Sequence, residues 1–393
     1  MEQQLLLKNR PRIEVVDALR GFAVMAIILL HNIEHFNLYS FPEPASDFMA
    51  ALDQGIWATL FFLFSGKAYA IFALLFGFSF FIQDENQLRK GKDFRLRFAW
   101  RLVLLFLIGN VNAAFFPGEI LVLYSILGFV LIPCCRLSNR WVLALAVLLM
   151  LQPMEWGKCF YALAHPEYEA AAASWRLHAR DLYPALMADE FWQMIRTNLW
   201  HGQLFSLLWA WDYGRFFQTS SLFLLGMWLG RQGLFTHLEQ HRRFWIGVGL
   251  TGALCFVPLY FLVDALPGWI VRAEVLSPLS TIVSSLRNFA FMSVWVSLFL
   301  SLWQAEAPRL WLKQLVPYGK MSLTNYLTQS LVGSFLYFGY GLALYDDLGT
   351  TSSFTVGVGL FLLQLGFCHW WLRHHQHGPF EALWRKATWI GAK

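Results

Sequence analysis

Charged residues are scarce in this chain of 393 amino acids: Asp, Glu, Lys and Arg together make up 14% of it. Soluble domains carry about 25% charged residues, so the composition excludes an ordinary soluble protein. The net charge of +5 is not concentrated in a basic tract, and we expect no nucleic-acid partner. The chain also lacks low-complexity segments, heptad runs and obvious internal repeats, which excludes coiled coils and solenoids.

Cysteine is also rare, and its five positions show no metal-ligand spacing. We therefore expect small buried side chains rather than a metal centre at Cys134, Cys135, Cys159, Cys255 and Cys368. No cleavable signal peptide is expected either. Residues 1–13 are polar and basic, and the apolar run that follows them is too long for a signal sequence.

Apolar residues are abundant, at 57% of the chain, and the mean hydropathy is +0.47. Repeated apolar runs of about 20 residues predict an all-α, polytopic helical membrane protein. The 19 Trp fit this class, because Trp favours the membrane interfaces. Ten spans are predicted, at 15–37, 60–82, 99–115, 119–135, 141–157, 216–232, 244–263, 281–303, 321–342 and 354–372.

Two of the apolar runs leave their form open. The run 55–82 is too long for one straight helix, so either it breaks at Gly66-Lys67 or residues 53–65 lie along the interface. In the run 275–303, Pro278 favours a helix that begins late.

The distribution of Lys and Arg predicts the orientation in the membrane. Of the 30 basic residues, 21 fall in segments on the side of the N-terminus, six on the opposite side and three within spans. The positive-inside rule then places both termini in the cytoplasm. We therefore expect one transmembrane domain over residues 1–393, a periplasmic loop or cap over residues 158–215 and a cytoplasmic tail over residues 373–393.

The loop at 158–215 is the only long segment between predicted spans. Helix-forming stretches occupy Glu167–Ala188 and Asp189–Leu208 and are amphipathic. Its tryptophans suit a cap that lies on the outer leaflet or over a cavity.

The first predicted span carries ionisable side chains that a plain membrane anchor would lack. Ionisable groups at membrane depth are costly and commonly face a cavity or a partner. At about 100° per residue, the step from Arg20 to His31 returns to nearly the same helix face, roughly 16 Å further along the axis. Asp17, Arg20, His31 and His35 therefore form one polar stripe, suited to an elongated ligand with a charged group at Arg20 and a reacting atom at His31. A structural ion pair with interfacial histidines is the simpler alternative.

Five further residues are candidates, each with a structural alternative. Lys67 either extends its ammonium toward the interface or binds a ligand phosphate. Arg287, within a span, needs a carboxylate, carbonyl groups or a ligand anion. Glu119 either caps an outer helix terminus or serves as a base or a partner of a histidine. Asn325 and Gln329 share a helix face with Ser322, which helix–helix hydrogen bonding also explains.

Several motifs together resemble the YeiB-like family of bacterial membrane proteins, whose domain has no defined function. They are Asp17-x-x-Arg20-Gly21, Phe72–Gly77, Gly118–Leu121 with Tyr124 and Gly128, Leu225–Met227 with Gly230-Arg231, Gly319–Tyr326 with Gln329-Ser330, and Gly378–Glu381 with Trp384-Arg385. The resemblance extends over nearly the whole chain.

That family is similar in turn to a wider superfamily of transmembrane acyltransferases, which includes heparan-glucosaminide N-acetyltransferases and the acyltransferase-3 enzymes of bacterial envelope sugars. The acyltransferase-3 enzymes carry a basic residue, ten residues and then a histidine, and Arg20 and His31 match that spacing. The resemblance implies acyl-CoA, in the simplest case acetyl-CoA, as co-substrate, with no metal.

The resemblance implies a role for each candidate. His31 would act as general base or hold the acyl group, Asn32 would polarise the thioester carbonyl, and Glu119 would orient or protonate His31. The cofactor-binding candidates are Asp17, Arg20, Lys67, Arg287, Asn325 and Gln329.

The sequence thus favours an acyltransferase of the bacterial cytoplasmic (inner) membrane. It would move an acyl group from cytoplasmic acyl-CoA to a periplasmic or lipid-linked acceptor, with membrane lipids as surroundings and a homodimer as a compatible assembly. Two alternatives stay open: a transporter or flippase for a lipid-linked or small anionic solute, and a non-catalytic membrane partner or sensor.

Overall fold

The structure is a computed structural model that describes residues 13–391, and these residues form helices and no strand. In chain order the elements are α2 (Glu14–Glu34), α3 (Asp47–Phe64), α4 (Ala68–Leu88), α5 (Arg95–Ala113), α6 (Leu121–Leu127), η1 (Gly128–Val130), α7 (Leu131–Cys134), α8 (Asn139–Met150), α9 (Pro153–Ala164), α10 (Trp175–Met187), α11 (Phe191–Thr197), η2 (Asn198–Gly202), α12 (Gln203–Asp212), α13 (Arg215–Arg231), α14 (Arg242–Trp269), α15 (Ala273–Gln304), α16 (Glu306–Leu312), α17 (Leu315–Lys320), α18 (Ser322–Tyr337), α19 (Thr350–His374) and α20 (Pro379–Thr388).

Within the described residues, six helical segments are long and apolar enough to cross a membrane, or seven if a bent pair counts as one span. The six are Glu14–Glu34, Asp47–Leu88, Arg95–Ala113, Arg242–Trp269, Ala273–Gln304 and Thr350–His374. The bent pair is α8 and α9, which meet at 44°. The predicted all-helical class is confirmed for the described residues, and these segments have the length and composition of membrane-crossing helices.

The two apolar runs whose helix boundaries the sequence left open, 55–82 and 275–303, behave differently. Helix α3 ends at Phe64 and α4 begins at Ala68, so the predicted break at Gly66-Lys67 is confirmed. Gly66 has a φ of +75°, and a Cβ there would collide with the Asn288 amide, so this turn requires glycine. The late start predicted for α15 is wrong. The helix begins at Ala273 and includes Pro278, because packing along α14 outweighs one missing backbone hydrogen bond.

The break between α8 and α9 is fixed by Gln152, whose backbone is left-handed, with a φ of +58°. Its buried side-chain amide donates to the Gly214 carbonyl at 2.9 Å and to the Ser285 hydroxyl at 3.0 Å. These bonds tie the bend to the start of α13 and to α15. The bend therefore positions the wall of the large cavity described below.

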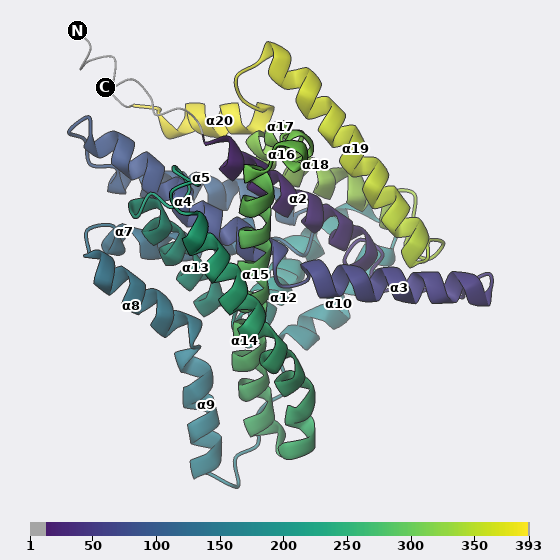
Figure 1. The fold of residues 1–393 in the computed structure, drawn as a ribbon. Coiled ribbons are helices and arrows are strands. Elements are labelled where there is room, and N and C mark those ends of the chain that lie inside the picture. The colour runs from purple at the N-terminus through teal and green to yellow at the C-terminus, as the bar shows by residue number, and fades with distance from the viewer. Residues whose placement is uncertain (1–12, 392–393) are drawn as a thin grey trace.

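The segment predicted as a cap is helical, with shifted boundaries. The first helix begins at Trp175 rather than Glu167, and a second helical stretch runs from Phe191 to Asp212 through the π-turn η2. The tail also holds a helix, α20, which lies across α5 at one end of the bundle (Figure 1). The described residues do not include residues 1–12 and 392–393. The predicted single domain, the N-terminal part of the charge count and the end of the predicted tail therefore lie partly outside them.

Helix α2 is at the centre of the bundle, and most of its side chains are buried. It packs closely against α17, where a Cβ on Gly319 would lie 1.8 Å from the Asp17 carbonyl oxygen. The helices α14 and α19 are far more exposed: only 6% and 17% of their most apolar windows are buried. This is the arrangement expected for a buried central helix surrounded by lipid-facing helices.

Two family-like motifs meet at the end that carries α20. The Glu381 carboxylate accepts hydrogen bonds from the backbone nitrogens of Leu323 at 2.8 Å and Thr324 at 3.0 Å. It also accepts the Thr324 hydroxyl at 2.5 Å. Because the first backbone N–H groups of a helix have no partner within it, Glu381 caps α18.

Candidate functional site

Two adjoining cavities lie in the bundle. A small one of about 210 Å³ is lined by His31 and Glu119 among others, and a large one of about 1390 Å³ opens beside it. Five residues line both cavities, namely Glu34, Tyr39, Ser65, Trp209 and Arg215. The two spaces are therefore neighbours with a shared wall.

His31 lies near the end of α2 and lines the small cavity. Its ring packs on Phe116, with centroids 4.7 Å apart, and approaches Tyr326 at 6.5 Å. Its Nδ1 is buried and has no hydrogen-bond partner among the described residues. A buried polar atom without a partner in a protein generally indicates a missing water or ligand, so His31 is available to one.

Glu119 reaches the same cavity from the turn between α5 and α6. Its carboxylate accepts hydrogen bonds from the Asn112 side chain and the Leu121 backbone nitrogen, while its carbonyl accepts the Ser206 hydroxyl at 3.2 Å. The adjacent backbone nitrogen of Ile120 donates to the Tyr326 hydroxyl at 3.2 Å. The structure thus brings His31 and Glu119 into one cavity, although no hydrogen bond joins them.

Lys67 lines the large cavity at the α3–α4 turn and is only 6% exposed. Its ammonium donates to the Phe62 carbonyl at 2.8 Å and lies 5.3 Å from the ring centroid of Phe291. Carbonyl groups at a helix C-terminus favour a cation, which explains how a Lys is retained here. Carbonyl dipoles therefore hold the Lys67 ammonium, and no carboxylate within residues 13–391 forms an ion pair with it.

Arg287 lines the same cavity from α15. Within residues 13–391 its guanidinium makes no hydrogen bond and no ion pair, although Asp264 on α14 acts on it electrostatically. Its neighbour Asn288 is 8% exposed and carries an unpartnered Oδ1. Both of these side chains are free to contact a molecule in the cavity.

Arg215 belongs to this site, but sequence reasoning treated it only as an outside charge. It is the first residue of α13, and its guanidinium carbon lies 4.2 Å from the Tyr69 ring centroid and 5.6 Å from that of Trp209. One nitrogen donates to Gln218 at 3.3 Å. Its place directly after the aromatic residues of the predicted cap was the available signal.

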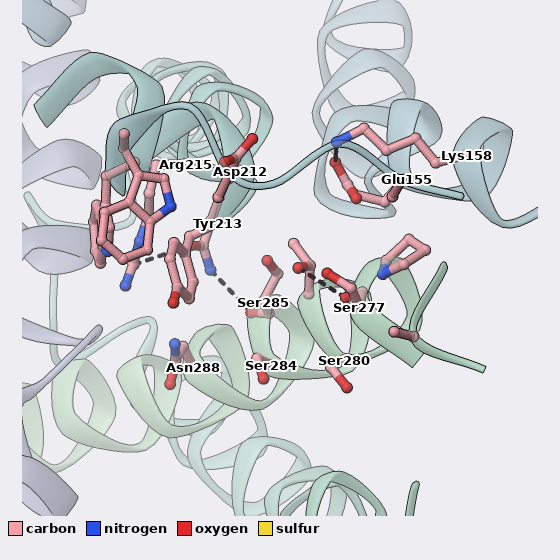
Figure 2. A pocket seen from close by; sticks show the side chains of 18 of the residues that line it. Glu155, Lys158, Asp212, Tyr213, Arg215, Ser277, Ser280, Ser284, Ser285 and Asn288 are labelled. Carbon is pink, nitrogen blue, oxygen red and sulfur yellow. Dashed lines mark hydrogen bonds and ion pairs between the residues drawn. The ribbon is translucent and has the colours of Figure 1, made fainter. Parts of the chain in front are cut away.

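Figure 2 shows one wall of the large cavity, a row of hydroxyl groups along α15 that leads toward Asn288 and Arg215. Its members are Ser277, Ser280, Thr281, Ser284 and Ser285. The steps of three and four residues place them on one helix face. At the other end of the row, Glu155 and Lys158 form an ion pair at 2.7 Å. Nearby, burial raises the pKa of the Asp212 carboxyl, and the charge of Lys158 opposes the rise.

Asp17 and Arg20 line neither of these two cavities. Arg20 donates to the Asp17 carboxylate at 2.9 Å and to the Ser79 hydroxyl on α4 at 2.9 Å. Along α2 the small cavity reaches Ile27, seven residues from Arg20. The predicted stripe is therefore divided, with an ion pair at one end and a cavity at His31.

The remaining candidates lie in helix contacts. Asn32 is fully buried, donates to the Ile28 carbonyl at 2.8 Å and packs beside Gly357 of α19. Asn325 donates to the Tyr318 carbonyl at 3.0 Å and contacts Cys368, as helix–helix hydrogen bonding predicts. Gln329 is 1% exposed, and its amide nitrogen and oxygen have no partner among the described residues. None of the three lines the two cavities. Over residues 13–391 no group of three or more His, Cys, Asp or Glu could hold a metal ion.

The comparisons with known proteins find relatives along nearly the whole chain, and none of their descriptions gives an activity. Residues 229–391 match a family described as "Protein of unknown function (DUF418)". The chain is 28% identical to the uncharacterized protein YxaH of Bacillus subtilis (strain 168), over 96% of this chain and 94% of that protein. It is 23% identical to an uncharacterized 39.9 kDa protein in the amylase 3' region of Bacillus acidopullulyticus, over 96% and 94% of the two chains.

A third relative carries the name given to the predicted family. The chain is 25% identical to the uncharacterized protein YeiB of Escherichia coli (strain K12), over 95% of each protein. No solved structure matches this fold significantly. The predicted resemblance is confirmed: the chain is similar to YeiB along nearly its whole length, and residues 229–391 match the DUF418 family.

Proposed function

We propose that this protein is a membrane-embedded acyltransferase that moves an acyl group, in the simplest case acetyl, from acyl-CoA to a hydroxyl or amine of an envelope acceptor. One observation carries the proposal. His31 and Glu119 come from different elements and line one small cavity, which adjoins a chamber large enough for a second substrate. A general base beside two substrate spaces is the minimum that group transfer requires.

In this reaction His31 takes the proton of the acceptor hydroxyl while the hydroxyl oxygen attacks the thioester carbonyl of acyl-CoA. The new C–O bond forms, the C–S bond breaks, and the proton passes from His31 to the departing CoA thiolate. Glu119, held by Asn112 and the Leu121 backbone, orients the imidazole or supplies a charge beside it. Proton transfer by such a positioned group contributes typically 10²- to 10⁴-fold to a rate.

The proposal includes an orientation in the bacterial inner membrane. Each of the ten predicted spans corresponds to one helix or one broken helix of the fold, and we propose that all ten cross the bilayer. Both termini and the tail at 373–393 then face the cytoplasm, and residues 158–215 form a periplasmic cap. The Lys and Arg distribution supports this orientation. The acceptor then reaches the large cavity from the periplasmic side.

The donor enters from the opposite side in this scheme. Arg20 lies seven residues before Ile27, which is about 10 Å along the helix. The pantetheine arm of acyl-CoA therefore needs a passage between α2 and α4 that extends the small cavity toward Arg20. Transfer across the membrane thus involves a second, more open arrangement of these two helices.

The test uses the purified full chain in vesicles with radiolabelled acetyl-CoA and an envelope extract as acceptor. Wild-type protein should transfer label, and His31→Ala should reduce transfer at least 100-fold while remaining folded and inserted. His178→Ala is the matched control, because His178 on α10 lines neither cavity, and it should transfer at the wild-type rate. Equal rates for His31→Ala and wild type would remove His31 from the reaction.

A transporter or flippase for an anionic solute is the second candidate, and the cations Lys67, Arg215 and Arg287 in the large cavity favour it. If wild-type protein binds an anionic ligand but transfers no label, that result would support this second function.

A further inference from the structure

We propose that Lys67, Arg215 and Arg287 form a binding site for a phosphate group, and that the large cavity holds the polyhydroxylated, phosphate-bearing part of the acceptor. Only the identification of the ligand as the acceptor rests on the proposed function, since the anion site follows from the cavity itself. Sequence reasoning assigned Lys67 and Arg287 to the phosphates of CoA. Their shared cavity with Arg215 points instead to the second substrate.

The three cations come from different elements and line one cavity. Lys67 comes from the α3–α4 turn, Arg215 from the start of α13 and Arg287 from α15. The charges of both arginines act on Lys67. Holding like charges around one partly buried cavity is costly unless an anion compensates them.

The acids around the same cavity are engaged elsewhere. Glu155 pairs with Lys158 at 2.7 Å, Glu274 with Arg272 at 3.6 Å, and Glu34 accepts the Tyr39 hydroxyl at 3.2 Å. The fourth acid, Asp212, is influenced by Lys158. Asp264 on α14 acts on Arg287 electrostatically, but among the described residues no carboxylate forms an ion pair with any of the three cations. Their charges are therefore open to a ligand anion.

The geometry around the cations favours phosphate over a small inorganic anion. Within residues 13–391 Arg287 has no hydrogen-bond partner, and Arg215 lies over two aromatic rings with one nitrogen engaged. Guanidinium groups suit the oxygens of phosphate because they donate two parallel hydrogen bonds. Next to them, Asn288 is 8% exposed, lines the cavity and carries an unpartnered Oδ1. This oxygen accepts hydrogen bonds, so it suits a hydroxyl group beside the phosphate.

The hydroxyl row on α15 indicates what is attached to the phosphate. The hydroxyls of Ser280 and Ser284 have no partner among the described residues, and both residues line the large cavity. Hydroxyl groups that both donate and accept suit sugar or glycerol hydroxyls. A volume of about 1390 Å³ exceeds the 300–1,000 Å³ of ordinary small-molecule sites and accommodates a phosphate with one or more sugars.

The chemistry is shared by two sources, a water-soluble sugar phosphate and a phospholipid headgroup. Purified full-length protein in neutral detergent is titrated calorimetrically with glucose 1-phosphate and, for comparison, with glucose. In parallel, the protein in nanodiscs is tested for glucose 1-phosphate binding with phosphatidylglycerol or with phosphatidylcholine as the lipid. Competition by phosphatidylglycerol would identify the lipid headgroup as the natural source, and its absence would identify the soluble phosphate.

Glucose 1-phosphate should bind at least tenfold more tightly than glucose, and Arg287→Gln should weaken it at least tenfold. Arg287→Lys should retain part of the affinity, which separates lost charge from lost folding. Arg89→Gln is the control, since Arg89 pairs with Glu85 and lines neither cavity, and its affinity should be unchanged. Equal binding of glucose and glucose 1-phosphate, or an equal loss in Arg89→Gln and Arg287→Gln, would overturn the proposal.

The binding experiment contains no acyl donor, so its outcome is independent of the acyl-transfer assay described above. If the protein binds the phosphate but transfers no acyl group, the anion site is supported and the acyltransferase function is refuted. If it transfers an acyl group to a neutral acceptor but does not bind the phosphate, the acyltransferase function is supported and the anion site is refuted.

Discussion

Replacing Arg20 by Gln should lower the stability of the fold. The Arg20 guanidinium donates to the Asp17 carboxylate and to the Ser79 hydroxyl, each at 2.9 Å, and so joins α2 to α4. The side chains of Arg20 and Asp17 are 17% and 5% exposed. A pair this protected from water is removed at a larger cost than a surface pair, because the acid keeps its burial and loses its guanidinium.

The expected cost lies between two limits. Exposed pairs contribute about 0.2–1 kcal/mol, and removal of one partner from a fully buried pair costs about 3–5 kcal/mol. The exposure of Arg20 places Arg20→Gln at about 2 kcal/mol. Because Asp17→Asn also removes the charge from the acid, the double variant should recover about 1 kcal/mol, a coupling of the size found between residues in contact.

The assay is unfolding of the full-length protein in mixed micelles by increasing SDS, followed by tryptophan fluorescence, with acetyl-CoA binding measured by calorimetry on the same samples. Arg89→Gln is the control, since Arg89 pairs with Glu85 at 2.7 Å with side chains 42% and 26% exposed. It should change the unfolding free energy by no more than about 0.5 kcal/mol. An Arg20→Gln protein that unfolds like wild type but no longer binds acetyl-CoA would refute this reasoning and make Arg20 a donor-binding residue.

Three shorter predictions test the Glu381 cap of helix α18, the pH dependence of stability and the orientation in the membrane. Glu381→Ala should lower the unfolding free energy by about 1–2 kcal/mol in the same SDS titration, because the N-terminal turn of α18 at Thr324 loses its cap; no change would show that water replaces it. Hydrogen bonds from Arg95 lower the pKa of the Asp93 carboxyl from 3.8 to about 2, so this group stabilises the fold fully above pH 3.8 and loses its effect as the pH falls toward 2. Asp93 is half exposed, and Asp93→Asn should reduce stability at pH 6 by about 0.5 kcal/mol and leave it unchanged at pH 2. A cysteine in place of Ala172 should react with a membrane-impermeant maleimide in intact spheroplasts, whereas labelling only in inverted vesicles would reverse the proposed orientation.

The positions of most helices in this protein follow closely from local sequence signals. Apolar runs near 20 residues located the helices, and Gly66-Lys67 located the break, because a left-handed turn followed by a buried cation cannot continue a helix. Pro278 misled the prediction of α15, since the sequence does not display the packing along α14 that holds its first turns.

The sequence predicts those features of the candidate site that depend only on which residues share a helix face. The position of His31 on α2 follows from its spacing, and the turn that carries Glu119 leads into the same cavity. The period also aligned Arg20 with His31, but it says nothing about what each end of α2 meets. Arg20 meets Ser79 on α4, whereas His31 meets a cavity. The alignment on one face therefore did not give one continuous site.

What the sequence could not reveal is which charges have partners. Arg20 and Arg287 are both arginines in apolar helices, and sequence patterning treats them alike. In the fold Arg20 has a carboxylate and a hydroxyl, whereas Arg287 has no hydrogen-bond partner among the described residues and lines a cavity with two other cations. An arginine with its donors satisfied is retained for stability, and one with its donors free in a polar chamber needs a ligand to justify its cost. The functional part of this membrane protein is therefore best sought at Arg287 and His31, where polar atoms remain free.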